Sequence, residues 1–391
     1  MMSGWARMGL VLACAGLAAG CGSKPQTAAA AGARSGLVTP SAPAVTVPLS
    51  TSLVTAQGTW AIAVMGGSAA SENNFWQLFV RPTGAGQWSE VTPPGVADNG
   101  GLVAAGTGTS LVIGFRPSQN LAFSPLATST DAGRNWTPGL LDADLGNESG
   151  ALAVDPSGQA LALLQDGTIQ TAPTAGAAAA GQWSELTTRQ ALAASAPGRD
   201  CGLQALDAVS FGPDKTPMTA GSCERPGVAG VFTDTSGRWQ SAGLALPAAY
   251  RDDQVQVLGL AATSGGNVAL LLAGDSLLAA WSNGTRWTVS APVEGVGAGS
   301  VRASGFGTGG SAWLLVSGGR AETISGPDAG WHGLPTGPAG TATLAPGPGD
   351  AWDALAVSGS ELTVWQLAKG APAHWVQNQM IKVPIEYGSS S

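Results

Sequence analysis

Charged residues are scarce in this chain, and so are the residue types that most often perform chemistry. Lys, Arg, Asp and Glu together make up 11% of the 391 residues, and there are only two His, two Tyr and four Cys. The formal net charge is −8, and no basic run or stripe is present. A nucleic-acid-binding protein needs such a patch to neutralise phosphates, so we expect no nucleic-acid partner.

Catalytic motifs are missing as well. The chain has no nucleophile elbow, no metal-ligand spacing and no phosphate-binding loop. His332 and His374 each adjoin a tryptophan within a repeated strand pattern. We therefore expect them to pack or to lie on the surface, and not to act as the general base that activates a catalytic cysteine. The sequence therefore predicts no metal and no cofactor, and it favours a protein without catalytic activity.

Apolar runs long enough to span a membrane are absent too. The run that stands out covers residues 10–20, follows a start that carries Arg7, and ends in small residues. This layout is typical of a secretory signal peptide and is too short for a transmembrane helix. We therefore expect residues 1–20 to direct export of the chain.

The end of this run, Leu-Ala-Ala-Gly-Cys at residues 17–21, resembles the lipobox of bacterial lipoproteins, with Ala18 where Leu is commoner. The resemblance implies that Cys21 becomes the N-terminus and carries lipid, which would be the only attachment to the membrane. It places the protein at the cell membrane, lipid-anchored and facing the extracytoplasmic side. The alternative is an ordinary signal peptide with an incidental cysteine.

The other cysteines agree with export. Cys14 lies in the apolar run and is lost on processing, so Cys201 and Cys223 remain as one pair. In an oxidising compartment a disulfide between them is the default expectation. Residues 21–50, rich in Ala, Pro and Ser, predict a flexible tether, and residues 51–391 predict the folded domain.

Tryptophan marks an internal repeat in that domain. Seven tryptophans follow a polar or Gly-containing turn, at intervals of 48, 47, 56, 48, 44 and 44 residues. They are Trp88, Trp136, Trp183, Trp239, Trp287, Trp331 and Trp375. Within the fifth period, residues 255–263, 267–273, 276–281 and 287–293 have the pattern of four strands separated by turns. We therefore predict an all-β fold, a seven-bladed β-propeller of four-stranded antiparallel blades, with six or eight blades as the alternatives.

One turn carries a family resemblance. Residues 129–136, Ser-Thr-Asp-Ala-Gly-Arg-Asn-Trp, resemble the Asp-box, or BNR, repeat, in which Ser129, Asp131, Gly133 and Trp136 match and Asn135 replaces Thr. Degenerate copies lie at residues 233–239 and 328–331. The resemblance implies a structural turn between the third and fourth strands of a propeller blade. Sialidases, photosystem assembly factors and sorting receptors use this box, so it identifies the fold and not the function.

Charged loops supply the candidate binding site. Cys201 and Cys223 are expected at the open end of a hairpin that turns at residues 212–215, and three short loops beside them carry seven charges. This candidate binding face consists of Arg199, Asp200, Glu224, Arg225, Tyr250, Arg251, Asp252 and Asp253. Loops on a rigid scaffold are where binding residues concentrate. The alternative is that these charges only solvate exposed loops.

The function that these features favour is a non-catalytic binding or scaffold module for an envelope protein or glycan. The alternative is a sialidase-like glycoside hydrolase, which requires an arginine cluster, a Tyr nucleophile polarised by a Glu, and an Asp acid/base. The Arg-Ile-Pro signature of that family is not matched; residues 79–82 come nearest, and only Tyr250 and Tyr387 could act as nucleophiles. A photosystem-type assembly factor is a third hypothesis, by analogy of fold.

Overall fold

The computed structural model describes residues 52–66, 74–93, 102–115, 124–141, 149–212, 214–263, 265–284, 286–347, 351–368 and 373–384. All of them belong to the compact unit Ala42–Ser391. The expected signal peptide, Cys21, the tether and Tyr387 lie outside the described residues.

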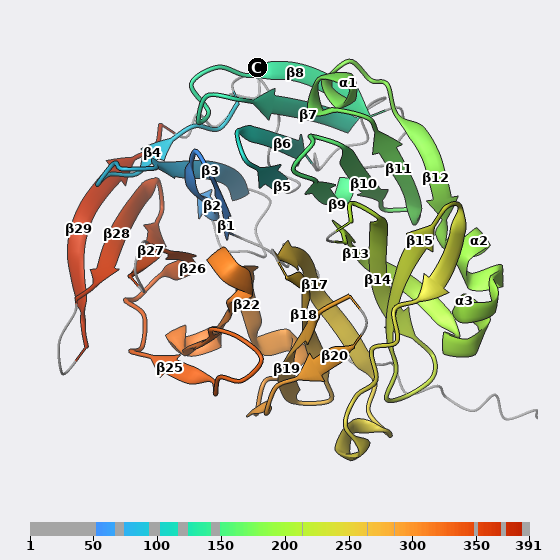
Figure 1. Ribbon diagram of the computed structural model, residues 1–391. Coiled ribbons are helices and arrows are strands. Elements are labelled where there is room, and N and C mark those ends of the chain that lie inside the picture. The colour runs from blue at the N-terminus through green and yellow to red at the C-terminus, as the bar shows by residue number, and fades with distance from the viewer. Residues whose placement is uncertain are drawn as a thin grey trace, which may run out of the picture. The chain divides into compact units, whose positions relative to one another are not determined.

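Strands dominate the described residues, and they follow one another in groups of four antiparallel neighbours (Figure 1). One parallel pair, Ser52 with Gly305, also joins the first and sixth groups into a single eight-stranded sheet. The first group is β1 (Ser52–Thr55), β2 (Gly58–Gly66), β3 (Asn74–Pro82) and β4 (Ser89–Glu90). The second is β5 (Leu102–Thr107), β6 (Ser110–Phe115), β7 (Ser124–Ser129) and β8 (Thr137–Leu141). The third is β9 (Ser149–Val154), β10 (Ala160–Leu164), β11 (Thr168–Ala172) and β12 (Ser184–Thr188).

The next groups repeat this order. The fourth is β13 (Leu203–Phe211), β14 (Pro217–Cys223), β15 (Ala229–Thr235) and β16 (Arg238–Ser241). The fifth is β17 (Val255–Thr263), β18 (Gly266–Ala273), β19 (Ser276–Ser282) and β20 (Trp287–Val289), to which β21 (Val293–Glu294) is added. The sixth is β22 (Val301–Phe306), β23 (Ala312–Val316), β24 (Ala321–Ile324) and β25 (His332–Leu334). The last is β26 (Thr341–Pro346), β27 (Trp352–Ser358), β28 (Glu361–Leu367) and β29 (Trp375–Lys382).

This strand order confirms the predicted all-β propeller class. The predicted strands of the fifth repeat match β17 to β20 to within a few residues. We interpret each group as one blade and number the blades 1 to 7 in chain order; the count of seven stays our interpretation.

Apolar strands explain how the blades stack. Along β18, Val268, Leu270 and Leu272 pack against blade 6, whereas Ala269 and Leu271 pack against blade 4. Alternate side chains of one strand thus serve two neighbours, because successive side chains point to opposite faces of a sheet. A buried cluster of this kind joins every successive pair of blades from 1 to 7, and another joins blade 7 to blade 1.

Six of the seven repeated tryptophans lie at these junctions, whereas Trp239 packs beside the disulfide of blade 4. Trp287, Trp331 and Trp375 each pack against the preceding blade and donate their indole N–H to a carbonyl just after its fourth strand. The acceptors are the carbonyls of Ala242, Ala291 and Pro335, at 2.9, 3.0 and 3.1 Å. A buried indole needs such a partner for its polar end. The interval of the repeat therefore reflects the spacing from one blade junction to the next.

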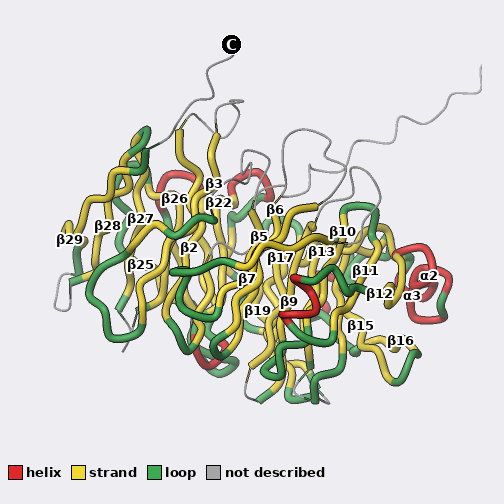
Figure 2. The backbone as a smooth tube through the Cα atoms, turned by 90° about the horizontal axis from the view of Figure 1, so that it is seen from above, coloured by secondary structure: helices red, strands yellow, loops and turns green. Residues whose placement is uncertain are grey.

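Short helices interrupt the strand pattern in two places. One is α1 (Ala175–Ala179), before β12; the others are α2 (Arg189–Ala194) and α3 (Ala196–Cys201), which lie between β12 and β13. Figures 1 and 2 show α2 and α3 beside β12 and β15, outside the sheet of blade 4. The four 3-10 turns are Ala248–Tyr250, Ala298–Ser300, Thr308–Gly310 and Ser317–Gly319. None of the described helices has the length and apolarity needed to cross a membrane.

The pair α2 and α3 corrects our expectation of a plain loop before blade 4. Thr188 and Ser195 cap the two helices by accepting hydrogen bonds from the backbone N–H groups of Ala191 and Gly198. Gly202 ends α3 in a left-handed conformation, with φ of 69°. This insertion accounts for the longest of the six tryptophan intervals, the 56 residues from Trp183 to Trp239.

Contacts that involve side chains, and no shared strand, close the ring between blades 7 and 1. Within the described residues, each of these blades is built from one continuous segment, so no strand is shared between them. Arg81 of β3 forms an ion pair with Asp353 of β27, and their side chains are 8% and 1% exposed. Trp88 donates its indole N–H to the same carboxylate, at 2.8 Å, and its ring lies 5.3 Å from the Arg81 guanidinium carbon.

Main-chain groups of Trp88 complete this closing seam. The Gln379 side chain of β29 accepts a hydrogen bond from the Trp88 N–H and donates one to the Trp88 carbonyl, both at 2.8 Å. Apolar residues of both blades surround the polar group, among them Phe79, Leu355 and Val364. Burial raises the pKa of Asp353, and the Arg81 charge opposes that rise.

We predict that Arg81→Met destabilises the domain by about 3–5 kcal/mol, because it leaves the Asp353 carboxylate buried without its cation. Urea unfolding followed by tryptophan fluorescence measures this. The control is Lys382→Met, since Lys382 lies 3.8 Å from Glu361 and is 81% exposed; here we expect a change below about 1 kcal/mol. Equal effects of the two substitutions would contradict a closing role for Arg81.

Candidate functional site

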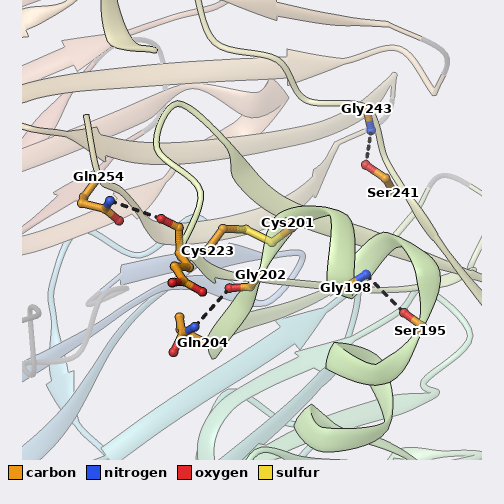
Figure 3. Close-up of a disulfide and its surroundings, with 10 residues drawn as sticks. Ser195, Gly198, Cys201, Gly202, Gln204, Cys223, Ser241, Gly243 and Gln254 are labelled. Atoms are coloured by element: carbon orange, nitrogen blue, oxygen red, sulfur yellow. Dashed lines mark hydrogen bonds between the residues drawn. A yellow bond between two sulfur atoms is a disulfide. The ribbon is translucent and has the colours of Figure 1, made fainter. Parts of the chain in front are cut away.

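The predicted disulfide is present at the entrance to blade 4. Cys201 ends α3, Cys223 ends β14, and their Cα atoms are 5.4 Å apart (Figure 3). Both residues are buried, next to Leu192, Leu203 and Phe232. Cys223 pairs with Leu203 rather than with Cys201, because Cys201 belongs to the inserted helix and not to the first strand as we expected. The disulfide therefore joins the helical insertion to the blade.

Backbone hydrogen bonds bring the three predicted loops together. Glu224 and Arg225 donate their N–H groups to the carbonyls of Gly202 and Cys201, at 2.8 and 3.2 Å. Gly227 donates to the carbonyl of Asp253, at 2.8 Å, which fixes the loop entering blade 5 against the turn after β14. A Cβ atom on Gly227 would lie 2.7 Å from the Arg251 Cα, so this approach requires glycine.

Most side chains of the candidate binding face point into solvent. Six of its eight residues are exposed: Arg199, Asp200, Glu224, Arg225, Arg251 and Asp252. Arg251 and Asp252 form an ion pair at 3.3 Å but remain 78% and 87% exposed, so the pair contributes little to stability. Arg199 donates to the carbonyl of Ala194. The face is thus a fixed backbone that carries solvent-exposed charges of both signs.

The sialidase alternative needs arginines that converge beside a tyrosine. Arg199, Arg225 and Arg251 do not form such a cluster in the part of the chain that the structure describes, since their recorded contacts are with separate groups. Arg81, which we noted as nearest to the family signature, lies in the closing seam between blades 7 and 1. These four arginines therefore do not assemble a carboxylate-binding pocket.

Tyr250 lies in a different environment from the charges around it. It is half-buried beside Ser276, which starts β19 and donates to a carboxylate oxygen of Glu294 at 2.7 Å. Burial raises the pKa of the Tyr250 hydroxyl, as do the charges of Glu294 and Asp253, while a hydrogen bond with Ser276 acts in the opposite direction. The hydroxyl is therefore held in its protonated form, which suits a hydrogen-bonding role better than nucleophilic attack.

Sequence reasoning missed Asp207, a half-buried acid in the blade that holds the disulfide. It lies at a β-bulge of β13, between Leu206 and Ala208, and the backbone N–H of Ser222 donates to it. One of its carboxylate oxygens is buried without a hydrogen-bond partner. Desolvation raises the pKa of Asp207 to about 6. The available signal was a single acidic residue within an otherwise apolar or neutral strand.

The turn that resembles an Asp-box lies on the opposite face of the blades. The Ser129 hydroxyl accepts a hydrogen bond from the Gly133 N–H at 2.9 Å, and Asp131 accepts one from the Asn135 N–H at 2.9 Å. The Asn135 side chain also donates to Asp131 and lowers the pKa of that carboxyl. Gln57, in the first turn of blade 1, bonds to the backbone of this turn. These contacts are structural, and Trp136 packs on blade 1.

Metal ligands do not gather in the described ranges, where no three His, Cys, Asp or Glu side chains are placed to hold an ion. The degenerate turn at residues 233–239 also keeps a structural geometry, with Asp234 buried and Ser236 and Gly237 at φ of 54° and 81°.

Comparisons with known proteins show the fold and no more. No protein-family model and no curated protein matches the chain. A solved structure from Lactobacillus plantarum has a TM-score of 0.51 and 11% identity, over 83% of this chain and 96% of that chain. YCF48 bound to D1 peptide has a TM-score of 0.46 and 14% identity, over 81% and 92%. Virginiamycin B lyase from Staphylococcus aureus has a TM-score of 0.42 and 11% identity, over 78% and 91%.

We predict that Asp207→Asn stabilises the domain at pH 8 by about 2 kcal/mol and has little effect at pH 4. In the unfolded chain this carboxyl ionises near its ordinary pKa of 3.8, whereas in the folded state it does so at about 6. The free energy of unfolding therefore falls as the pH rises from the unfolded pKa of 3.8 through the folded pKa of about 6. A neutral Asn side chain does not ionise, so the variant does not lose this stability. Urea unfolding at both pH values measures it.

Asp200→Asn is the matched control for this prediction, because Asp200 is an exposed acid near the same disulfide. We expect no change for it at either pH. A stabilisation by Asp207→Asn that is equal at pH 4 and pH 8, or a loss of stability at pH 8, would show that the Asp207 charge is not the cause.

Proposed function

We propose that this chain is a non-catalytic binding or scaffold protein that presents the candidate binding face of blades 4 and 5 to a protein partner. One observation carries the proposal: the disulfide and the loop-to-loop backbone bonds fix this face, while six of its charged side chains stay exposed. A backbone that is already ordered loses little conformational entropy on binding.

The charges of the face favour a partner of complementary charge. Acidic and basic residues alternate along its loops, as Arg199-Asp200 and Glu224-Arg225 illustrate, in a chain of which only 11% is charged. Such a mixed pattern penalises a wrong partner or a wrong orientation by bringing like charges together. It therefore supports recognition of a particular protein surface more than adhesion to a uniformly charged polymer.

The place of action that we propose is the extracytoplasmic side of the cell membrane, with lipid on Cys21 as the anchor. This rests on the lipobox-like residues 17–21 and on the apolar run before them. The disulfide supports it, because structural disulfides form and persist mainly in oxidising compartments. A tethered propeller at the membrane would meet its partner in the cell envelope.

We predict that reversing two charges of the face, with Arg225→Glu and Arg251→Glu, lowers recovery of the protein partner from envelope fractions at least tenfold. Crosslinking, affinity capture of the full chain and mass spectrometry measure it. The control pair is Arg238→Glu with Arg286→Glu, two exposed arginines at fourth-strand turns on the opposite face. Loss of recovery with the control pair alone, or identical recovery with all variants, would contradict the proposed face.

We predict that Cys21→Ser abolishes lipid attachment and releases the protein from the membrane fraction. Metabolic labelling with radioactive palmitate and mass spectrometry of the mature N-terminus measure it. Cys14→Ser is the control, because residue 14 lies in the segment that processing removes; it should leave labelling unchanged. Retained label in Cys21→Ser would show that another residue carries the lipid.

A further inference from the structure

A cavity lies between blades 6 and 7, apart from the candidate binding face of blades 4 and 5. Its volume is about 310 Å³. One wall is the turn Ser317–Gly319 after β23, and the other is residues 337–341, the loop entering blade 7. The loop that enters a first strand and the loop that leaves a second strand lie at the same face of a propeller, so the cavity opens on the face that also holds the disulfide.

Hydrogen bonds tie the two walls together, and four of their eight residues are glycines. Gly337 donates its N–H to the carbonyl of Gly319 at 2.9 Å, across the junction of the two blades. Thr341 donates to the carbonyl of Pro338 through both its N–H, at 3.1 Å, and its hydroxyl, at 2.6 Å. The cavity is therefore formed by fixed loops, and a ligand can approach their backbone closely.

Glycine keeps this space open. Gly318, Gly319 and Gly340 have φ of 83°, 80° and 81°, a conformation in which a side chain is strained. No aromatic residue lines the cavity. An aromatic plane for stacking a sugar ring is therefore missing among the lining residues.

Arg302 supplies the only charge among the lining residues. It lies at a β-bulge of β22, between Val301 and Ala303, at the position that Asp207 occupies in blade 4. Its Nε donates to the Ser317 hydroxyl at 3.0 Å, and that hydroxyl in turn donates to the Ser300 carbonyl at 3.2 Å. These bonds hold one edge of the guanidinium group against the wall.

The other edge of the Arg302 guanidinium has no carboxylate partner among the described residues. Arg81, Arg251 and Arg320 each form an ion pair, whereas Arg302 forms none. A guanidinium group presents paired N–H donors in a plane that matches a carboxylate. Arg302 is exposed, as are other arginines without an ion pair among the described residues, but it alone among them lines this cavity. In a chain with a net charge of −8, this placement favours an anionic ligand.

We propose that this cavity binds the C-terminal carboxylate of an extended peptide, with Arg302 as the group that recognises the charge. The glycine-rich space between the two loops admits the last residues of a chain, and the guanidinium pairs with the carboxylate. The proposal deepens the proposed binding function by adding a peptide terminus as the feature recognised; it does not depend on the face of blades 4 and 5.

The test uses a pooled library of N-acetylated tetrapeptides with free C-terminal carboxylates and the same pool with C-terminal amides. Affinity selection on the full chain, followed by mass spectrometry, identifies retained peptides, and calorimetry measures their dissociation constants. We expect retention from the free-acid pool and not from the amide pool. Arg302→Gln should weaken binding at least tenfold, Arg302→Lys less, and Arg286→Gln, on the opposite face, not at all.

The outcomes separate this proposal from the proposed function. Equal retention of the amide pool, retention only of peptides with internal Asp or Glu, or unchanged binding in Arg302→Gln would each overturn recognition of the terminal carboxylate. No retention of any peptide would overturn the cavity site as well. In each case, capture of the envelope partner through Arg225 and Arg251 still decides the binding function. Thermal unfolding of Arg302→Gln checks that this exposed position leaves the fold intact.

Discussion

The seam between blades 7 and 1 is the constraint on which the rest of the structure depends. Every blade buries apolar side chains on both faces, so an open ring would leave two such faces in water. Within the described residues, the seam is made without a shared strand. Directional polar contacts align the two blades at the seam, where no strand ladder does so. They involve Arg81, Asp353, Trp88 and Gln379.

Tryptophan also forms polar contacts at other junctions, and these contacts involve fewer groups than the seam does. At the junctions between blades 4 and 5, 5 and 6, and 6 and 7, an indole N–H donates to a backbone carbonyl of the preceding blade, so each of these contacts is local to two consecutive repeats. At the seam the preceding blade lies at the far end of the chain, and Trp88 meets the Asp353 side chain instead. A backbone fixed by these junctions lets the loops above it vary, as the helical insertion before blade 4 illustrates.

Two kinds of recognition surface follow from this arrangement. Above blades 4 and 5, a disulfide and backbone bonds order three loops while their charges remain in solvent. Between blades 6 and 7, glycine loops enclose a space with a single cation. Asp207 and Arg302 occupy equivalent bulges of two first strands, so one backbone irregularity places opposite charges at two sites. The repeated blade thus fixes where these side chains lie, and the residue type at each bulge sets the charge there.

The sequence by itself determined the features that depend on near neighbours along the chain. Alternation of apolar residues, turn residues and the spacing of tryptophan predicted the four-stranded repeat, and the pairing of Cys201 with Cys223 followed from their number and the expected compartment. It also predicted which loops would meet beside the disulfide. The helices α2 and α3 were missed, although the Ser195 cap and Gly202 were visible signals for a helix.

Only the tertiary structure decided what depends on residues that are distant in sequence. Arg81 and Asp353, 272 positions apart, carry no mark of their pairing in the sequence. The raised pKa of Asp207 comes from burial by surrounding residues, and the cavity beside Arg302 comes from loops of two different blades. Turns and strands are specified by local backbone preference, whereas burial, ion pairing and cavities are set by whichever segments the closed ring brings together.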